Sequence, residues 1–239
     1  MEIILITLLT IVASAIGTIT GFGTSTIMIP ILALFLSPGE AIFLVSIIHW
    51  FGNVWKITLF RSGINWKLIG LFGVTGLVTS YFGAAVTLNI DDSVLLRVLG
   101  VFLAVYAIFL LFQSKLKLPA SSSVALVGGS LSGFFAGMFG IGGAIRSAFL
   151  TIFDLPKAVY IATAGAIGLM VDSTRVVTYV AGGMMLPQTL LYGLLIFIPT
   201  SFCGAYIAKR IVDKIPQRQF RSIVAMLILI IGIKLVVWP

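Results

Sequence analysis

Apolar residues follow one another in long runs along most of the chain, and short polar or glycine- and proline-containing breaks separate these runs. A helix needs about 20 apolar residues to cross a bilayer, whereas the strands of a membrane barrel alternate apolar with polar positions. The pattern therefore predicts an all-α polytopic membrane protein. The ten predicted segments are 2–20, 22–36, 40–60, 65–87, 94–112, 122–139, 141–153, 157–180, 186–208 and 218–238.

Composition agrees with a membrane protein. Of 239 residues, 60% are hydrophobic and 9% are charged, whereas a soluble domain carries about 25% charged residues. The first residues lack the basic region of a signal peptide, so segment 2–20 is expected to remain as a helix. The single cysteine, Cys203, excludes an internal disulfide and a cysteine-based metal cluster.

Two glycine-rich stretches indicate an internal duplication. Gly21-Phe22-Gly23 aligns with Gly140-Ile141-Gly142 at an offset of 119 residues (140 − 21), about half the chain. Ser80-Tyr81-Phe82-Gly83-Ala84 similarly matches Ser201-Phe202-Cys203-Gly204-Ala205 at an offset of 121 (201 − 80). We therefore expect two repeats of five segments, 1–113 and 121–239, joined by a linker at 114–120 within one membrane domain.

The loop charges predict that the two repeats have opposite orientations. In the first half the loop after the third segment is basic and the loop after the fourth is acidic, while in the second half the loop after the ninth segment is basic. Cytoplasmic loops carry the excess of lysine and arginine, so equivalent loops lie on opposite sides of the membrane. The linker is then cytoplasmic and both termini lie outside. The net charge of +8 is thereby explained by orientation, and no nucleic-acid partner is predicted.

Segments 22–36 and 141–153 are short for a membrane span. At about 1.5 Å per residue they cover some 20 Å of a hydrocarbon core roughly 30 Å thick. Each is expected to form, with the helix before it, a hairpin whose glycine-rich tip lies inside the membrane, although whether they span or re-enter is left open. Inverted repeats with broken helices that meet near the midplane are typical of secondary transporters.

The paired glycine stretches, each opening a short segment, with Pro30 closing the first, resemble the TauE/SafE sulfite-exporter family. The resemblance covers nearly the whole chain, and Gly140-Ile141-Gly142-Gly143 is its most specific part. It implies ion-gradient-driven export of a sulfur-containing anion such as sulfite, sulfoacetate or another organosulfonate. The chain departs from the family pattern at four positions: Thr24 and Ser25 replace glycines, Phe149 replaces a proline, and Arg146 replaces an apolar residue.

The glycine tips are the first candidate binding site. A helix that begins at Phe22 or Ile141 offers unpaired backbone N–H groups and the positive end of its dipole to an anion. The predicted substrate-binding residues at the tips are Gly21, Phe22, Gly23, Thr24, Ser25, Gly140, Ile141, Gly142 and Gly143. The alternative is that glycines serve helix packing, which we favour for Gly133 and Gly137.

Arg146 is the second candidate for substrate binding. It follows Gly142 by four residues and Gly143 by three, so these residues share a helix face and the side chain leans toward the tip. An arginine near mid-membrane costs about 2.5–3.5 kcal/mol, which favours a functional role. The alternative is an arginine that reaches the interface from the end of a short helix.

Three further polar residues lie within apolar segments and are candidates for proton coupling. Asp172 precedes Arg175 by three residues, so the two can form a structural ion pair. Alternatively, Asp172 takes a coupling proton and Arg175 helps to attract the anion, and Ser173 lies beside them. His49, the only histidine, and Asn53 lie one turn apart and serve either proton coupling or a hydrogen bond between helices.

The remaining polar residues of these segments are assigned to the membrane surface. Lys56, Trp50, Trp55 and Trp66 are interpreted as interfacial anchors.

Together these features predict a secondary transporter of a prokaryotic cytoplasmic membrane that works by alternating access. Its partners are a small anion, a coupling ion (a proton is favoured) and membrane lipids, and a homo-oligomer is compatible with the sequence. An anion channel on the same scaffold is the alternative. A membrane-embedded enzyme or cofactor-handling subunit is disfavoured, because only Asp154 and Asp172 are acids near membrane depth; no metal or cofactor is predicted, and haem would need His49 as its ligand.

Overall fold

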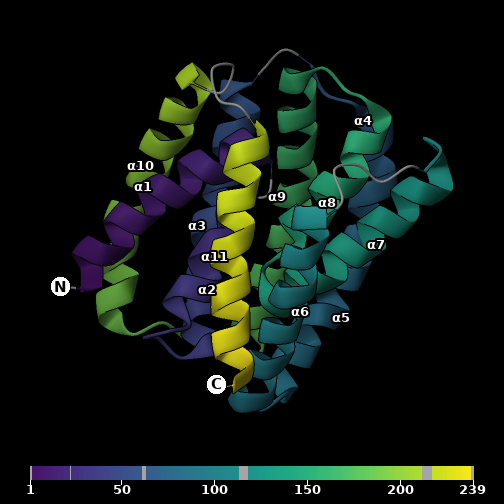
Figure 1. The fold of residues 1–239 in the computed structure, drawn as a ribbon. Helices are drawn as coiled ribbons and strands as arrows, with labels where there is room; N and C mark the ends of the chain where they lie inside the picture. Colours follow the sequence, from purple (N-terminus) through teal and green to yellow (C-terminus); the bar gives the residue numbers. More distant parts are fainter. Residues whose placement is uncertain (1, 22, 61–62, 113–117, 212–216, 238–239) are drawn as a thin grey trace.

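The computed structural model describes residues 2–21, 23–60, 63–112, 118–211 and 217–237, and the regular elements of these ranges are all helical (Figure 1). In chain order they are α1 (Glu2–Thr20), α2 (Ser25–Leu32), α3 (Pro38–Leu59), α4 (Trp66–Leu68), the π-helix η1 (Ile69–Gly73), α5 (Val74–Asn89), α6 (Asp92–Phe112), α7 (Ser122–Phe139), α8 (Gly142–Leu150), the 3-10 helix η2 (Thr151–Phe153), α9 (Lys157–Ala181), α10 (Gln188–Ile211) and α11 (Gln217–Val237). The predicted all-α class is confirmed.

Six helical stretches of the described ranges are long and apolar enough to cross a membrane. They are Glu2–Ile19, Pro38–Leu59, Trp66–Asn89, Asp92–Phe109, Ser122–Phe139 and Gln188–Ile211. The two segments predicted to be short contain α2, which has 8 residues, and α8, which has 9. Each of these short helices follows a long helix after a glycine-containing break, as the hairpin prediction requires.

Local signals in the sequence explain several helix boundaries. Ser37 caps α3 by accepting a hydrogen bond from the backbone N–H of Glu40, whose carboxylate accepts the Ser37 N–H in return. Asn65 caps α4 in the same way by accepting from the N–H of Leu68. At the other end of a helix, Gly140 adopts the left-handed conformation (φ 73°) that terminates α7.

The long helices pack in pairs that join the two halves of the chain. Helix α1 lies along α10, α5 lies along α7, α3 lies against α9, and α6 lies against α11. The first helix of each half thus packs on a helix of the other half. This reciprocal exchange agrees with a duplicated protein, while the opposite orientation of the repeats and the division at 114–120 stay predictions. Residues 114–117 of that linker, residue 113 before it and Phe22 lie outside the described residues.

Small residues and hydroxyl groups make the α5–α7 contact close. A Cβ atom at Gly133 or Gly137 would collide with the backbone of α5, which confirms the packing role predicted for these two glycines. The hydroxyl groups of Thr79 and Thr87 donate to the carbonyl oxygens of Ser130 (2.8 Å) and Met138 (2.6 Å). These hydrogen bonds satisfy polar groups where the bilayer supplies no water.

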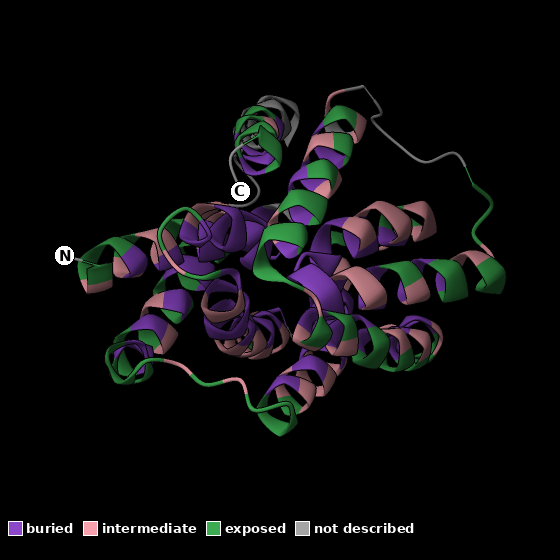
Figure 2. Cartoon of the chain, turned by 90° about the horizontal axis from the view of Figure 1, so that it is seen from below, coloured by how far each residue is buried: buried purple, intermediate pink, exposed green. Residues whose placement is uncertain are grey.

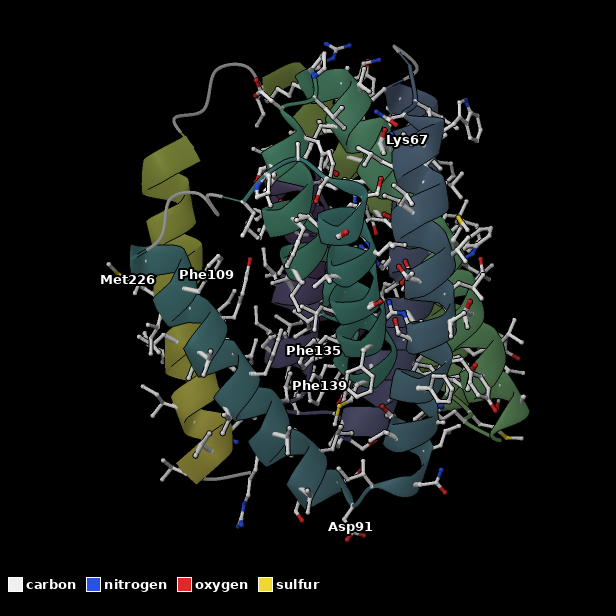
Figure 3. All side chains as sticks on the ribbon, turned by 90° about the vertical axis from the view of Figure 1, so that its right-hand side faces the viewer. Lys67, Asp91, Phe109, Phe135, Phe139 and Met226 are labelled. Carbon is white, nitrogen blue, oxygen red and sulfur yellow. The ribbon has the colours of Figure 1, made fainter. Side chains whose placement is uncertain are left out.

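Helices α6 and α11 lie side by side along one flank of the molecule (Figure 3). Phe135 and Phe139 of α7 face this pair, and the ring of Phe102 from α6 stacks on Phe135 with centroids 4.7 Å apart. Figure 2 shows that buried residues gather toward the middle of the bundle and exposed residues toward its outside. Many exposed side chains are large and apolar. An apolar outer surface is what a membrane-embedded protein presents to lipid, and most of the buried side chains are apolar as well.

Candidate functional site

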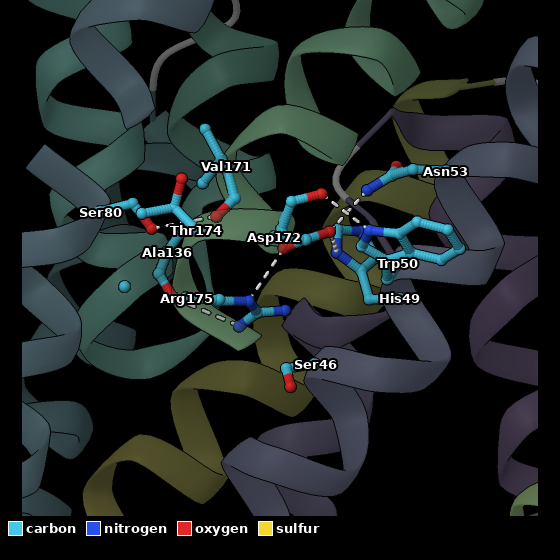
Figure 4. Close-up of polar contacts among 12 residues, drawn as sticks. Ser46, His49, Trp50, Asn53, Ser80, Ala136, Val171, Asp172, Thr174 and Arg175 are labelled. Carbon is cyan, nitrogen blue, oxygen red and sulfur yellow. Dashed lines mark hydrogen bonds and ion pairs between the residues drawn. The ribbon is translucent and has the colours of Figure 1, made fainter. Parts of the chain in front are cut away.

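A cluster of polar side chains occupies the contact between α3 and α9, where an apolar interior would be expected. His49, Asn53 and Lys56 share one face of α3, because they are spaced by four and three residues. Asp172 and Arg175 face them from α9 (Figure 4), and these five side chains are at most 3% exposed. We call these five residues the polar core. Buried polar groups of this kind persist only when they are paired or functional.

The carboxylate of Asp172 is the centre of the polar core. Its Oδ1 lies 2.9 Å from Nε of Arg175, and its Oδ2 lies 2.8 Å from Nδ1 of His49. The same Oδ2 accepts a hydrogen bond of 2.7 Å from Nδ2 of Asn53 (Figure 4). The predicted Asp172–Arg175 pair is therefore present, and His49 and Asn53 belong to the same network. Asp172 joins α9 to α3 across the contact between the two halves.

Arg175 also reaches the second glycine tip. Its Nη1 donates to the carbonyl oxygen of Ala136 at the end of α7 (3.2 Å). A Cβ atom at Gly140 would lie 2.5 Å from the same Nη1, so the absence of a side chain at position 140 lets the guanidinium approach the tip. Gly142 serves another purpose, because a Cβ atom there would collide with the carbonyl oxygen of Ser132 in α7. Ile141 and Gly143 are buried beside these residues.

The first glycine tip reaches the polar core from the other side. Gly23 is left-handed (φ 85°), and a Cβ atom there would lie 2.5 Å from Nε2 of His49. Gly21 is also left-handed (φ 76°) and faces the hydroxyl group of Tyr160. Both tips, predicted from the sequence to form one site, thus end against the polar core or beside it.

The hydroxyl groups after the first tip differ in their surroundings. Thr24 donates to Oγ of Ser14 at 3.5 Å. Ser25 is fully buried, and its Oγ has no hydrogen-bond partner among the described residues. An unpaired buried hydroxyl group is costly, and it is available to a ligand that enters the site.

Arg146 enters the same region from α8. It is 1% exposed, and its Nε and Nη2 have no hydrogen-bond partner in the described ranges. Its Nη2 lies beside Gly168 of α9, where a Cβ atom would be 2.9 Å from Nη2 and 2.6 Å from Nδ2 of Asn53. The structure therefore brings Arg146 next to the polar core, between α8, α9 and α3.

The sequence analysis was wrong about Lys56, which is not an interfacial anchor. It is 3% exposed, and its Nζ donates to Oδ1 of Asn53 at 3.1 Å. The spacing from His49 and Asn53 was the available signal, since it places all three on one helix face. Of the three tryptophans assigned to the interface with it, Trp66 is 74% exposed, whereas Trp50 and Trp55 are half-buried and donate to Ser173 and Ser201.

Tyr160 and Ser147 were also missed by the sequence analysis. Their hydroxyl groups are hydrogen-bonded to each other. Ser147 follows Arg146 in the chain, and Tyr160 faces Gly21. Neither residue stands out in the sequence, because a tyrosine near the start of a membrane helix is common at the interface. Only the folding of α8 against α9 brings them together.

Positive charge exceeds negative charge in this buried region. Lys56, Arg146 and Arg175 face one carboxylate, that of Asp172, in the part of the chain that the structure describes. Buried charges are stable only when they are compensated. The arrangement suits the binding of an anion. Among the described residues, no three histidine, cysteine or acidic side chains gather where they could hold a metal ion.

Comparisons with known proteins identify similar proteins among membrane transporters. The family model described as sulfite exporter TauE/SafE matches residues 6–235. A protein of Methanocaldococcus jannaschii named as a probable membrane transporter protein is 34% identical over 98 residues. That alignment covers 37% of this chain and 37% of the relative, so it spans little more than a third of each.

Proposed function

Because the chain belongs to the sulfite exporter TauE/SafE family, we propose that it is a secondary transporter that exports a small sulfur-containing anion. The proposed substrates are sulfite, sulfoacetate or another organosulfonate, and the proposed location is the cytoplasmic membrane of a prokaryote. The observation that carries the proposal is the excess of buried positive charge, with Lys56, Arg146 and Arg175 opposed by the carboxylate of Asp172 alone in the described ranges.

The anion binds between the two glycine tips, beside Arg146. The Nε and Nη2 groups of this arginine lack partners among the described residues and supply two donors. A guanidinium group binds planar or pyramidal oxyanions through paired hydrogen bonds, which gives both strength and orientation. The hydroxyl group of Ser25, also unpaired and buried, adds a third donor. Backbone N–H groups at the starts of α2 and α8 favour negative charge in the same place.

Arg175 contributes mainly positive charge, and of its donors only Nη2 has neither an ion-pair nor a hydrogen-bond partner among the described residues. Its guanidinium is already bound to Asp172 and to the carbonyl oxygen of Ala136. It therefore raises the positive potential at the second tip and fixes the position of Gly140, which it contacts. This division explains why the two arginines have different surroundings within one site.

Transport requires that the buried site become open to each side of the membrane in turn. In the structure the side chains of the site are at most 3% exposed, which corresponds to an occluded state. The two halves of the chain meet at α3 and α9, so rocking of one half against the other opens the site alternately. A proton moves with the anion in this proposal, and His49, Asp172 and Lys56 are the side chains of the polar core whose charge can change.

Anion binding by the purified protein tests this function. We expect sulfite, thiosulfate and sulfoacetate to give saturable heats in calorimetry, and Arg146→Ala to weaken binding at least tenfold, because hydrogen bonds to charged groups are worth about 1.5–3 kcal/mol. Arg97→Ala is the matched control, since Arg97 is exposed on α6, and it should bind as the wild type does.

Two results would contradict the proposal. Absence of binding for all three anions would remove the transporter function, and unchanged binding by Arg146→Ala would remove this arginine from the site. Flux into proteoliposomes distinguishes the channel alternative, because a transporter saturates with anion concentration and a channel does not.

A further inference from the structure

Lys56 is the charged residue of the polar core with the weakest compensation. Its Nζ donates to the amide oxygen of Asn53, which is neutral. Neither of the ion pairs found in the described residues includes Lys56. An ammonium group in an apolar interior without a carboxylate partner is costly, and lysine is the basic residue that loses its proton most readily when buried.

The contrast with Arg175 shows what is unusual about Lys56. The two residues are 119 positions apart (175 − 56), the offset that aligns the glycine tips, and Asn53 and Asp172 have the same separation. Each cation thus follows its partner by three residues on equivalent helices. Arg175 has a carboxylate at that place, whereas Lys56 has an amide. The charge of one pair is balanced and that of the other is not.

The other two titratable groups of the polar core, Asp172 and His49, are engaged with each other. The carboxylate of Asp172 receives Arg175, His49 and Asn53, and protonation would disrupt these contacts. His49 is fixed through Nδ1 to Asp172, and its Nε2 faces Gly23 without a hydrogen-bond partner among the described residues. Lys56 differs from both, because a neutral amine keeps an N–H group for the Asn53 oxygen.

We propose that Lys56 carries a proton together with the transported anion: its side chain is a neutral amine in the empty site and an ammonium group when the anion is bound. One proton is taken up from solution as the anion enters, and it is released when the anion leaves. The bound anion supplies the negative charge that Lys56 lacks. This inference rests on the proposed function and adds to it the residue that couples anion and proton.

The charges that face Lys56 come from three helices. His49 lies on its own helix α3, Arg146 faces it from α8, and Asp172 faces it from α9. Helix α2 packs on α3 and has no charged residue, and the charged residues of α10, Lys209 and Arg210, are exposed near its end. One cation, Arg146, and one carboxylate that is already shared by Arg175 and His49 therefore act on Lys56, which leaves little compensation for a permanent ammonium group in the empty site.

The test measures proton uptake on anion binding. Thiosulfate is titrated into the purified full-length protein by calorimetry, at one pH, in two buffers with different ionisation enthalpies. Thiosulfate is chosen because, unlike sulfite, it does not itself take up a proton near neutral pH. We expect the wild-type heats to differ between the buffers in the sense of proton uptake. Lys67→Gln, which changes an exposed lysine, should behave in the same way.

Three variants of the polar core decide between the titratable groups. Lys56→Arg should bind thiosulfate within a few-fold of the wild type and without proton uptake, because a guanidinium group stays charged. Lys56→Gln should bind at least tenfold more weakly, also without uptake. His49→Gln should retain uptake. Size-exclusion chromatography checks that each variant is folded, and if Lys56→Arg is not, the comparison of Lys56→Gln with His49→Gln gives the answer.

The possible failures have different signatures. Binding by the wild type with identical heats in the two buffers would overturn the inference and leave the proposed function intact. Uptake that persists in Lys56→Arg, or that is lost in His49→Gln alone, would assign the proton to another residue and overturn it as well. Absence of any thiosulfate, sulfite or sulfoacetate heat in the wild type would overturn the proposed function together with the inference.

Discussion

The pair Asn53–Lys56 on α3 and the pair Asp172–Arg175 on α9 have the same geometry and different charge. In each, a cation follows a side chain with an acceptor oxygen by three residues and is bound to it, at 3.1 Å in the first pair and 2.9 Å in the second. The two pairs are joined by the hydrogen bond from Asn53 to Asp172. The second pair is neutral in sum, and the first is positive whenever Lys56 is protonated.

We infer from this difference that the pair Asp172–Arg175 stabilises the fold and that the pair Asn53–Lys56 is available for function. A buried ion pair with additional hydrogen bonds is costly to break, because removal of one partner leaves the other charge alone. A buried lysine beside an amide can be removed with little loss of stability, since its own burial is unfavourable. Under the proposed function, we expect the same position in the two halves to serve stability in one half and ligand chemistry in the other.

Replacement of each basic side chain should give the largest difference in stability between the two pairs. Arg175→Met leaves the carboxylate of Asp172 without its closest cation, and we expect a loss of about 3–5 kcal/mol in the free energy of unfolding. Lys56→Met should change stability by less than about 1 kcal/mol, because it replaces a poorly compensated charge by an apolar chain of similar length. Chemical unfolding in detergent micelles measures both. Equal losses would show that the two pairs are equivalent in stability.

Substitution of the first glycine tip tests its contact with the α3 side of the polar core. Gly23→Ala places a Cβ atom against Nε2 of His49, in a left-handed residue. Gly183→Ala is the matched control, because Gly183 is also left-handed (φ 83°) but has no atom within 4 Å of its Cβ position. Gly23→Ala should therefore be less stable than Gly183→Ala by about 1–3 kcal/mol. A similar loss in both variants would mean that His49 can move away.

Introduction of a second carboxylate should make the two pairs alike. Asn53→Asp gives Lys56 an anionic partner and lowers the positive excess, but it also removes the donor to Asp172 and places a second carboxylate beside it, so we expect some loss of stability as well. We expect the affinity for thiosulfate to decrease about tenfold or more, because close charges interact by a few kcal/mol at an effective dielectric constant near 20. Calorimetry provides the measurement, and Asn89→Asp, at an exposed position of α5, is the control. Unchanged affinity in Asn53→Asp would show that charge excess does not hold the anion.

Exchange of the acid and the amide gives the smallest expected effect. Asp172→Asn alone should destabilise the protein, and the double variant Asn53→Asp with Asp172→Asn should recover about 1 kcal/mol of that loss, within the range of coupling between neighbouring residues. The physical reason is that the carboxylate then sits one helix away, still between Lys56 and Arg175. A double-mutant cycle from unfolding data measures the coupling. Strict additivity would argue against a shared network.

Much of the fold could be predicted from the pattern of apolar residues. The predicted segment 122–139 is α7 to the residue, and helix caps lie at Ser37, in the break before segment 40–60, and at Asn65, the first residue of segment 65–87. These features depend on local properties, namely chain hydrophobicity and the backbone preferences of serine, proline and glycine. The segments that were predicted to be short are also where the structure has its two short helices.

The candidate site could be predicted only in part. His49, Asn53, Asp172, Arg175 and Arg146 were identified because charged and polar residues are conspicuous in apolar segments. Their grouping was not visible, and Lys56 was misassigned because lysine near a helix end usually reaches the membrane surface. Its burial depends on Gly165, whose missing side chain lets α9 approach the base of Lys56.

Local properties of the sequence were enough to predict a helical membrane protein that resembles the TauE/SafE family, with two glycine-rich breaks and a small set of polar residues at membrane depth. Helix length, hydrophobicity and turn chemistry are properties of neighbouring residues, so they can be read along the chain. Which polar residues meet became visible in the tertiary structure, because the hydrogen bond between Asn53 and Asp172 joins residues 119 positions apart. Contacts over such distances depend on how whole helices pack, and in the described residues this packing places three buried basic side chains around the carboxylate of Asp172.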